Sequence, residues 1–373
     1  MIKPWSYERE YLFLRKKILN SLDKVFKSNM LFFGNELKSF EKKFIKINKS
    51  KYGLGVKSGT EALIIALKAL NVSNKDEVIT VSNTAIPTIS AIKAVGAEVK
   101  FVDVNEYYLM STDDLEKKIT KNTKAIIAVH LYGQSCDMSK ICKIAKKNNI
   151  KVIEDCAQAH GAQYKNQLVG NFGDIGCFSF YPTKNLGAYG DGGFITTNNF
   201  NLYKKIRRIR YYGIEQLNPR NKFNNKYYSF EDGINSRLDE VQSSILNIKI
   251  KYLKENIIKK KKIAEIYNKH LNIENLTLPK VNNHNEHTYH QYVVRSKDRE
   301  VILKNLKKKQ IYLNIIYPYP THVMPPFKQK NKLKNTEKYS KEIFSLPIYP
   351  NLSKKNQMEI INSLKEALNF KKK

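Results

Sequence analysis

Short apolar runs rich in β-branched residues alternate with segments of helical periodicity between about residues 50 and 200. The intervening segments, Glu61 to Leu70 and Met138 to Lys147, carry apolar residues at the spacing of one helix face. The strand-like runs are EVITVS (77–82), EVKFVDV (98–104), AIIAVH (125–130) and KVIED (151–155). This alternation predicts an α/β fold with a mostly parallel, doubly wound sheet and helices on both faces. Ligands of such sheets bind beyond the carboxyl ends of the strands.

The pattern changes after about residue 240. A long helix is predicted from Leu238 to about Ile258, and the strand-like HQYVVR (290–295) precedes another helical pattern. The Pro- and aromatic-rich IYPYPTHVMPP (316–326) predicts an ordered loop. Because 373 residues exceed the size at which one core usually stops growing, we predict two domains. Residues 1–250 would form the large domain with the sheet, and residues 251–373 a smaller α+β C-terminal domain.

Composition limits the class of protein. Hydrophobic residues make up 42% and charged residues 27% of the chain, the balance of a globular protein. No run approaches the roughly 18 apolar residues of a membrane span, and MIKPWSYEREYLFLRKKIL lacks the apolar segment of a signal peptide. We therefore expect a cytoplasmic protein without a membrane partner. The four cysteines are irregularly spaced and form no Cys/His metal pattern, so we expect reduced thiols and no metal site.

The formal net charge of +32 would attract anions, among them nucleic acid and acidic small molecules. The clearest lysine runs lack the interleaved aromatic residues of a nucleic-acid groove. These runs are Lys259 to Lys262, Lys304 to Lys309 and Lys371 to Lys373. We interpret them as solvated surface and expect no nucleic-acid partner. Steering of anionic substrates remains the alternative interpretation of the charge.

The segment GCFSFYPTKNLGAYGDGG (176–193) contains the first candidate for chemistry. An apolar strand ends there in Ser179, and Pro182 and a glycine-rich turn enclose Lys184. A lysine among small and apolar residues tends to lose its proton, and only the neutral amine forms an imine. Lys184 is therefore a candidate nucleophile.

Two other chain segments place polar groups at the ends of predicted strands. Asp155 ends a strand at the carboxyl edge of the sheet, where a carboxylate can keep a pyridine nitrogen protonated. Ser58, Gly59 and Thr60 precede a helix whose free N–H groups and dipole favour a phosphate. Ordinary helix capping is the alternative for both Asp155 and Ser58.

Together these segments resemble the DegT/DnrJ/EryC1/StrS family of nucleotide-sugar aminotransferases, which depend on pyridoxal phosphate (PLP) and have aminotransferase fold type I. The resemblance runs from about Gly34 to Leu352. It rests on seven motifs in order: SGTEAL (58–63), VHLYGQ (129–134), EDCAQAHGA (154–162), FSFYPTKNLGAYGDGG (178–193), GINSRLDEVQ (233–242), YPYPTH (317–322) and SLPIYP (345–350).

The resemblance implies a role for each candidate residue. Lys184 would form the Schiff base with PLP, Asp155 would pair with the pyridine nitrogen, and Gln158 would lie near the phenolic oxygen. The cofactor phosphate would be held by groups at a helix start and a strand end: Ser58, Gly59, Thr60 and Ser179. Asn235 would reach the same phosphate from the neighbouring subunit of a homodimer.

Ala85 departs from the family pattern, because many relatives carry an aromatic residue there that stacks on the cofactor ring. The absence of that aromatic ring would loosen cofactor binding by ~0.5 to 1.5 kcal/mol, the scale of an aromatic pair. Tyr181, Tyr317 and His322 are candidates for substrate contacts. The alternative is packing inside a loop for the two tyrosines and an ordinary surface histidine for His322.

The implied reaction is transamination, with pyridoxamine phosphate as the aminated form of the cofactor. L-glutamate would donate the amino group, and a dTDP-3-keto-6-deoxyhexose would accept it and become the 3-amino sugar. One alternative is a 4-aminotransferase acting on a UDP- or GDP-4-keto-6-deoxyhexose. An alternative from another class is a basic, nucleic-acid-binding regulator without enzymatic activity. Lys184 argues against a sugar dehydratase of the same fold, in which a histidine replaces the lysine.

Overall fold

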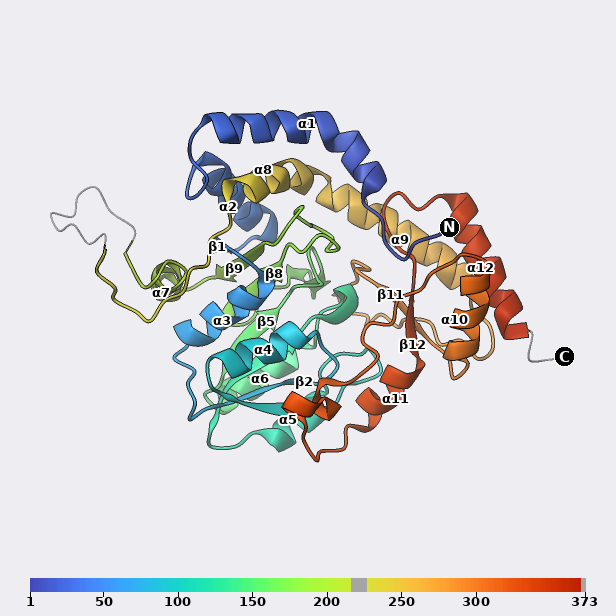
Figure 1. Cartoon of the computed structure of the whole chain (residues 1–373). Coiled ribbons are helices and arrows are strands. Elements are labelled where there is room, and N and C mark those ends of the chain that lie inside the picture. The colour runs from blue at the N-terminus through green and yellow to red at the C-terminus, as the bar shows by residue number, and fades with distance from the viewer. Residues whose placement is uncertain (216–226, 370–373) are drawn as a thin grey trace.

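The computed structural model describes residues 1–215 and 227–369 (Figure 1). Its centre is a seven-stranded sheet in the order β1-β9-β8-β5-β4-β2-β3. The strands are β1 (Tyr52–Val56), β2 (Glu77–Val81), β3 (Glu98–Val102), β4 (Thr123–Val129), β5 (Lys151–Asp155), β8 (Ile175–Ser179) and β9 (Gly193–Thr197). Only β9 runs antiparallel to its neighbours, β1 and β8. The other pairs are parallel, so the predicted mostly parallel sheet is confirmed.

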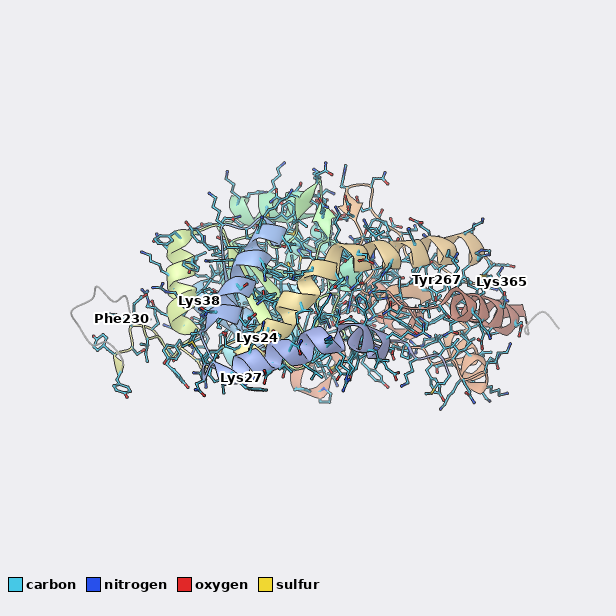
Figure 2. All side chains as sticks on the ribbon, turned by 90° about the horizontal axis from the view of Figure 1, so that it is seen from above. Lys24, Lys27, Lys38, Phe230, Tyr267 and Lys365 are labelled. Carbon is cyan, nitrogen blue, oxygen red and sulfur yellow. The ribbon has the colours of Figure 1, made fainter. Side chains whose placement is uncertain are left out.

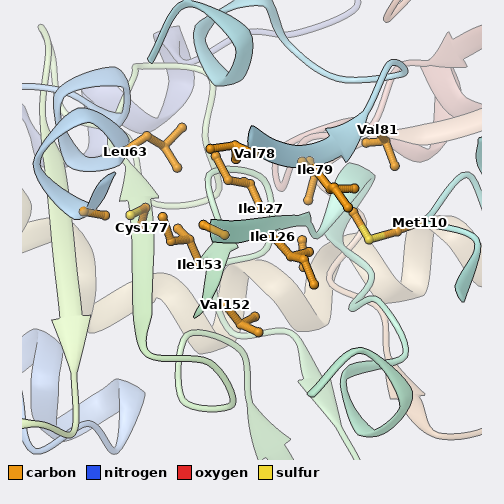
Figure 3. Packing of buried hydrophobic residues seen from close by; sticks show 14 of the residues in the cluster. Leu63, Val78, Ile79, Val81, Met110, Ile126, Ile127, Val152, Ile153 and Cys177 are labelled. Carbon is orange, nitrogen blue, oxygen red and sulfur yellow. The ribbon is translucent and has the colours of Figure 1, made fainter. Parts of the chain in front are cut away.

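Helices cover both faces of this sheet (Figure 1). Adjacent residues of a strand point to opposite faces, and β8 shows the consequence. Cys177 packs in one buried cluster with Leu63 (Figure 3), whereas the ring of Phe178 lies 5.1 Å from that of Phe44 in another. The helices up to residue 209 are α1 (Glu8–Lys27), α2 (Asn35–Asn48), α3 (Gly59–Ala69), α4 (Ile86–Ala94), α5 (Thr112–Lys118), α6 (Met138–Lys147) and α7 (Phe200–Ile209). Since Leu63 belongs to α3 and Phe44 to α2, these two helices lie on opposite faces.

The single helix predicted from Leu238 to about Ile258 is wrong. The structure has two helices there, α8 (Glu240–Lys249) and α9 (Leu253–His270), joined by a 3-10 turn at Ile250–Tyr252. No proline or glycine marks the junction in the sequence. The apolar pattern continues across the turn, and the break therefore has no local signal.

The C-terminal part has its own buried cluster, which includes Tyr267, Phe344 and Ile360. Its elements are β11 (Tyr292–Arg295) and the antiparallel β12 (Ile343–Leu346), with α10 (Arg299–Lys308), α11 (Lys334–Glu342) and α12 (Lys354–Asn369). Ile2 belongs to this cluster and pairs with Ile311, so the chain's first residues contact its last third. The domain boundary at residue 250 stays a prediction.

The remaining elements are short. The strands β6 (Gln163–Tyr164), β7 (Gln167–Leu168) and β10 (Asn285–Glu286) form a small antiparallel sheet. The loop predicted at 316–326 is confirmed, and it contains the 3-10 turns Thr321–Val323 and Pro325–Phe327. Within residues 1–215 and 227–369, no helix is both long enough and apolar enough to cross a membrane.

Most of the lysine surface is as predicted. Lys24, Lys27 and Lys38 point outward from α1 and α2 (Figure 2), and the lysines between residues 304 and 309 are exposed. The run Lys371 to Lys373 lies outside the described residues. The interpretation of Lys259 to Lys262 as solvated surface is wrong for one member, because Lys260 is buried.

Candidate active site

Lys184 lies on a tight turn that follows β8. Its backbone N–H donates to the carbonyl of Tyr181 at 2.9 Å, which closes the turn. Three residues later, a Cβ on Gly187 would lie 2.4 Å from the carbonyl oxygen of Pro182, so only glycine fits there. The turn thus fixes the direction in which the Lys184 side chain leaves the backbone.

Asp155 ends β5, the parallel neighbour of β8, and pairs in register with Cys177. Its side chain is held in place, because Oδ2 accepts a hydrogen bond from Thr88 Oγ1 at 2.9 Å and Oδ1 accepts one from Ala157 N at 3.1 Å. Burial raises the pKa of Asp155, while those two hydrogen bonds and the charge of Lys184 oppose the rise. A positive charge brought next to this carboxylate is therefore stabilised.

The amine of Lys184 shows the opposite effect of burial. Burial lowers the pKa of Lys184 to about 8, against the opposing pull of Asp155. A substantial fraction of this amine is therefore neutral near physiological pH, whereas a solvated lysine is almost wholly protonated. The neutral form is the one that attacks an aldehyde.

The start of α3 packs against the end of β8. Ser58 caps the helix, and its Oγ accepts from Glu61 N at 3.2 Å, so the capping alternative is part of the structure. A Cβ on Gly59 would lie 2.7 Å from Cβ of Ser179, so this glycine lets the helix start approach the strand end. The first N–H groups of a helix have no partner within the helix. Gly59, Thr60 and Ser179 together border a place suited to a phosphate.

Gln158 is fixed by two hydrogen bonds near the same edge of the sheet. Its Oε1 accepts from Tyr132 N at 2.9 Å, and its Nε2 donates to Tyr317 Oη at 3.0 Å. Burial raises the pKa of Tyr317 and the nearby Asp155 adds to the rise, while Gln158 opposes it. Tyr317 therefore keeps its proton and lies close enough to Asp155 to sense its charge. The structure joins two predicted site residues, Gln158 and Tyr317, through a direct contact.

Three other predicted residues lie at exposed or partly exposed positions. Ala85 precedes α4 and is partly exposed, and Tyr181 on the Lys184 turn is 53% exposed. The side chain of Asn235 is also exposed, while its neighbour Ser236 accepts a hydrogen bond from Lys57 N at 3.2 Å. Asn235 thus lies near the strand end that leads into Ser58. Whether it serves its own site or a partner's stays a prediction.

His322 lies behind this group of residues. His322 is only 1% exposed. Its Nδ1 lies 2.7 Å from Ser82 Oγ, and its Nε2 lies 3.4 Å from Glu337 Oε1. Both ring nitrogens therefore have protein partners. The alternative of an ordinary surface histidine is therefore wrong, because His322 is buried and its ring supports the segment that leads from Ser82 to Ala85.

Sequence reasoning assigned no role to several residues around Asp155 and Lys184. Thr88 orients Asp155, and its only sequence signal is its place one helical turn after Ala85. His160 and His290 are buried, and burial together with the charge of Lys184 lowers the pKa of both, to about 3 for His160. These imidazoles are neutral at physiological pH. His160 stands in the motif EDCAQAHGA, whereas His290 has no motif signal.

Among the residues that the structure describes, one group of three has metal-ligating atoms close together: His130, Glu154 and Cys156. The carboxylate of Glu154 already accepts a hydrogen bond from His130 Nε2 at 3.0 Å. It also accepts from three backbone N–H groups, those of Gly170, Phe172 and Gly173. Burial raises the pKa of the Cys156 thiol well above its usual value, which keeps it protonated. The group is therefore a hydrogen-bonded support for the loop after β7.

The residues fit PLP in their chemistry. A reactive amine, a buried carboxylate and an anion-binding helix start lie at one edge of the sheet, where α/β sheets bind ligands. Those three groups match the aldehyde, the pyridine nitrogen and the phosphate of this cofactor. Fold and site define a PLP-dependent enzyme of the aminotransferase class.

Comparison with known proteins gives the family. The chain matches the DegT/DnrJ/EryC1/StrS aminotransferase family over residues 13–365, and it belongs to that family. Its members are PLP-dependent aminotransferases, and so is this protein.

Individual relatives are similar over nearly their whole length. The chain is 42% identical to dTDP-3-amino-3,4,6-trideoxy-alpha-D-glucose transaminase from Micromonospora megalomicea subsp. nigra, covering 98% of each chain. It is 41% identical to dTDP-3-amino-3,6-dideoxy-alpha-D-galactopyranose transaminase from Aneurinibacillus thermoaerophilus, covering 94% of this chain and 95% of the relative. The crystal structure of DesV from S. venezuelae in complex with a ketimine intermediate superposes with a TM-score of 0.93 at 31% identity, over 98% of each chain. The expected fold, cofactor and enzyme class are confirmed.

Proposed function

We propose that the protein transfers the amino group of L-glutamate to a dTDP-3-keto-6-deoxyhexose and so forms the 3-amino sugar. The observation that carries the proposal is the pair formed by Asp155 at the end of β5 and Lys184 on the turn after β8, in which burial shifts the pKa of each group and the charge of the other opposes that shift. The names of the two dTDP-sugar transaminases that share over 40% of their residues with this chain support the nucleotide and the position aminated.

The chain's own residues divide the work of the reaction. The bound cofactor supplies an aldehyde and a ring that withdraws electrons from the atom being deprotonated. Asp155, oriented by Thr88 and Ala157, holds a proton on the pyridine nitrogen. The Lys184 amine, once displaced by the incoming amino donor, would carry the proton from the donor's α carbon to the C4′ carbon of the cofactor. In the second half-reaction it would carry a proton from C4′ to the sugar carbon that receives the amino group. Ping-pong kinetics follow from this order.

The charge and the exposed aromatic side chain suit an anionic sugar nucleotide. A net charge of +32 attracts both the diphosphate of the substrate and glutamate. Tyr181 extends from the Lys184 turn and is 53% exposed, which leaves its ring free to contact the substrate. We place the enzyme in the cytoplasm, as the sequence predicts.

A homodimer completes the proposal. Apolar side chains lie exposed along α1 and the segment after it, and such surfaces mark protein contacts. They are Leu12, Phe13, Leu19, Phe26, Met30, Leu31 and Phe32. The guanidinium of Arg237 lies 4.3 Å from the centre of the Phe32 ring, so this apolar surface adjoins the segment of Asn235. A second copy bound here would bring Asn235 near the partner's phosphate site.

The test is a panel assay. Purified protein is incubated with glutamate and dTDP-3-keto, dTDP-4-keto, UDP-4-keto or GDP-4-keto sugars, and mass spectrometry detects the amino product. Amination of the dTDP-3-keto sugar is expected, with loss of the product in Lys184→Ala. Amination of a UDP- or GDP-4-keto sugar alone would assign the protein to the 4-aminotransferases. A colourless protein that aminates none of them and shifts DNA at moderate salt would support the regulator alternative.

A further inference from the structure

Lys260 is buried beside the Lys184 turn although it belongs to a run of lysines. It is 6% exposed, whereas Lys259 and Lys262 on the same helix, α9, are exposed. Burying an ammonium group without a counter-charge is unfavourable, and burial lowers the pKa of Lys260 to about 7. Within residues 1–215 and 227–369, no carboxylate forms an ion pair with it. The burial of Lys260 therefore needs an explanation, because a buried lysine is not part of the solvated surface.

Two hydrogen bonds give that explanation. Lys260 Nζ donates to Asn185 Oδ1 at 2.8 Å and to the carbonyl oxygen of His290 at 3.3 Å. Two acceptors match the two N–H groups of a neutral amine. The other end of the same amide, Asn185 Nδ2, donates to the carbonyl oxygen of Thr288 at 3.2 Å. Both ends of the Asn185 side chain are thus fixed.

Asn185 directly follows Lys184 in the chain, so fixing its side chain also limits the backbone that carries the amine. The segment that receives these hydrogen bonds is itself anchored, because Thr288 N donates to Gly133 O at 2.8 Å. Lys184, Asn185 and Lys260 also line one small cavity. Lys260 therefore connects α9, the segment at residues 288–290 and the Lys184 turn.

We propose that Lys260 is a positioning residue for Lys184: through Asn185 it holds the turn so that the Lys184 amine reaches the cofactor aldehyde beside Asp155. The proposal rests on the proposed role of Lys184 as the amine that captures PLP. It assigns to Lys260 no contact with substrate or cofactor.

The test separates cofactor binding from cofactor capture. Pyridoxamine phosphate has no aldehyde, so its affinity for the full-length apoenzyme reports the pocket alone. PLP, by contrast, forms a covalent bond with Lys184, which absorbance follows in time and borohydride reduction with mass spectrometry locates. A general packing defect weakens pyridoxamine phosphate binding and also slows PLP capture, whereas a misplaced Lys184 slows PLP capture alone.

We expect Lys260→Met to slow PLP capture by about tenfold or more, the scale expected when a reacting group is displaced. Its affinity for pyridoxamine phosphate should stay within about twofold of wild type, because the residues proposed to hold the phosphate and the ring are unchanged. Lys260→Arg keeps donors to Asn185 and should recover most of the rate. Lys262→Met, an exposed neighbour on α9, should match wild type in both measurements.

Asn185→Ala provides a second route if Lys260→Met does not fold. It leaves Lys260 in place but cuts its link to the turn, and should slow capture as Lys260→Met does. Equal capture rates in wild type, Lys260→Met and Asn185→Ala would overturn the inference, as would parallel losses of pyridoxamine phosphate and PLP binding. If wild-type protein itself gave no adduct at Lys184, the proposed function would fail instead.

Discussion

Asp155 and Lys184 each oppose the pKa shift that burial causes in the other. Burial raises the pKa of Asp155 and the Lys184 charge lowers it, while burial lowers the pKa of Lys184 to about 8 and the Asp155 charge raises it. The relationship follows from topology. β5 ends at Asp155, opposite Cys177 in β8, and the chain passes Ser179 before the turn returns Lys184 toward the same edge.

This coupling predicts the pH dependence of cofactor capture. Because only the neutral amine attacks the aldehyde, the capture rate of the apoenzyme should rise about tenfold per pH unit below the pKa of Lys184. It should level off above a pH of about 8. Stopped-flow absorbance after mixing with PLP measures the profile, with free lysine as the control for titration of PLP itself. A midpoint near the ordinary lysine value would contradict the burial of the amine.

Asp155→Asn should move that midpoint downward, because the variant lacks the carboxylate that raises the pKa of Lys184. The same variant should lose about 10³-fold or more in turnover, since an amide cannot keep the pyridine nitrogen protonated. The two effects oppose each other. The Lys184 amine is neutral more often, which favours attack on the aldehyde, but the cofactor ring withdraws electrons less strongly, which slows turnover. Turnover close to wild type would show that another group protonates the ring.

The sequence predicted the fold best where strands are continuous. The runs at 77–82, 98–104, 125–130 and 151–155 each match a strand of the central sheet to within two residues at either end. They could be recognised because segments rich in β-branched residues alternate there with segments of clear helical periodicity. The turn at Ile250–Tyr252 could not be predicted, since apolar spacing carries on through it and no helix-breaking residue occurs.

The candidate site divides in the same way. Motifs identified Lys184, Asp155 and Gln158, and the structure places them at one edge of the sheet with Tyr317. The burial of Lys260 could not be predicted, because a lysine in a run of four resembles solvated surface until α9 is packed against the Lys184 turn.

The close approach of α3 to β8 predicts a selective defect in Gly59→Ala. The added Cβ would lie 2.7 Å from Cβ of Ser179 and would push the helix start away from the strand end. The affinity of the apoenzyme for PLP should fall about tenfold or more, the scale of charge-assisted hydrogen bonds to a phosphate. Pyridoxal, which has no phosphate, is the matched control. Equal losses for PLP and pyridoxal would place the phosphate elsewhere.

An aromatic side chain in place of Ala85 should increase the affinity for the cofactor. Replacing Ala85 with Trp or Tyr should restore a stacking surface for the cofactor ring and tighten binding of pyridoxamine phosphate by ~0.5 to 1.5 kcal/mol. Calorimetry on the apoenzyme measures the change. Ile86→Tyr, which adds an aromatic ring at an exposed neighbouring position, should leave the affinity unchanged. A weaker affinity in Ala85→Trp would indicate that the space beside Ala85 is already filled by protein.

The proposed role of Asn235 across a homodimer predicts complementation between two inactive chains. Lys184→Ala lacks the amine, and Asn235→Asp places a negative charge where the phosphate is proposed to bind. If Asn235 serves the partner's site, one of the two sites in a mixed dimer has both native residues, so random mixing restores about a quarter of the sites. If Asn235 serves its own subunit, every site in the mixture lacks one of the two residues and activity stays absent. Sedimentation of each variant and of the mixture checks that all remain dimeric, which makes the recovered activity a direct reading of which chain supplies Asn235.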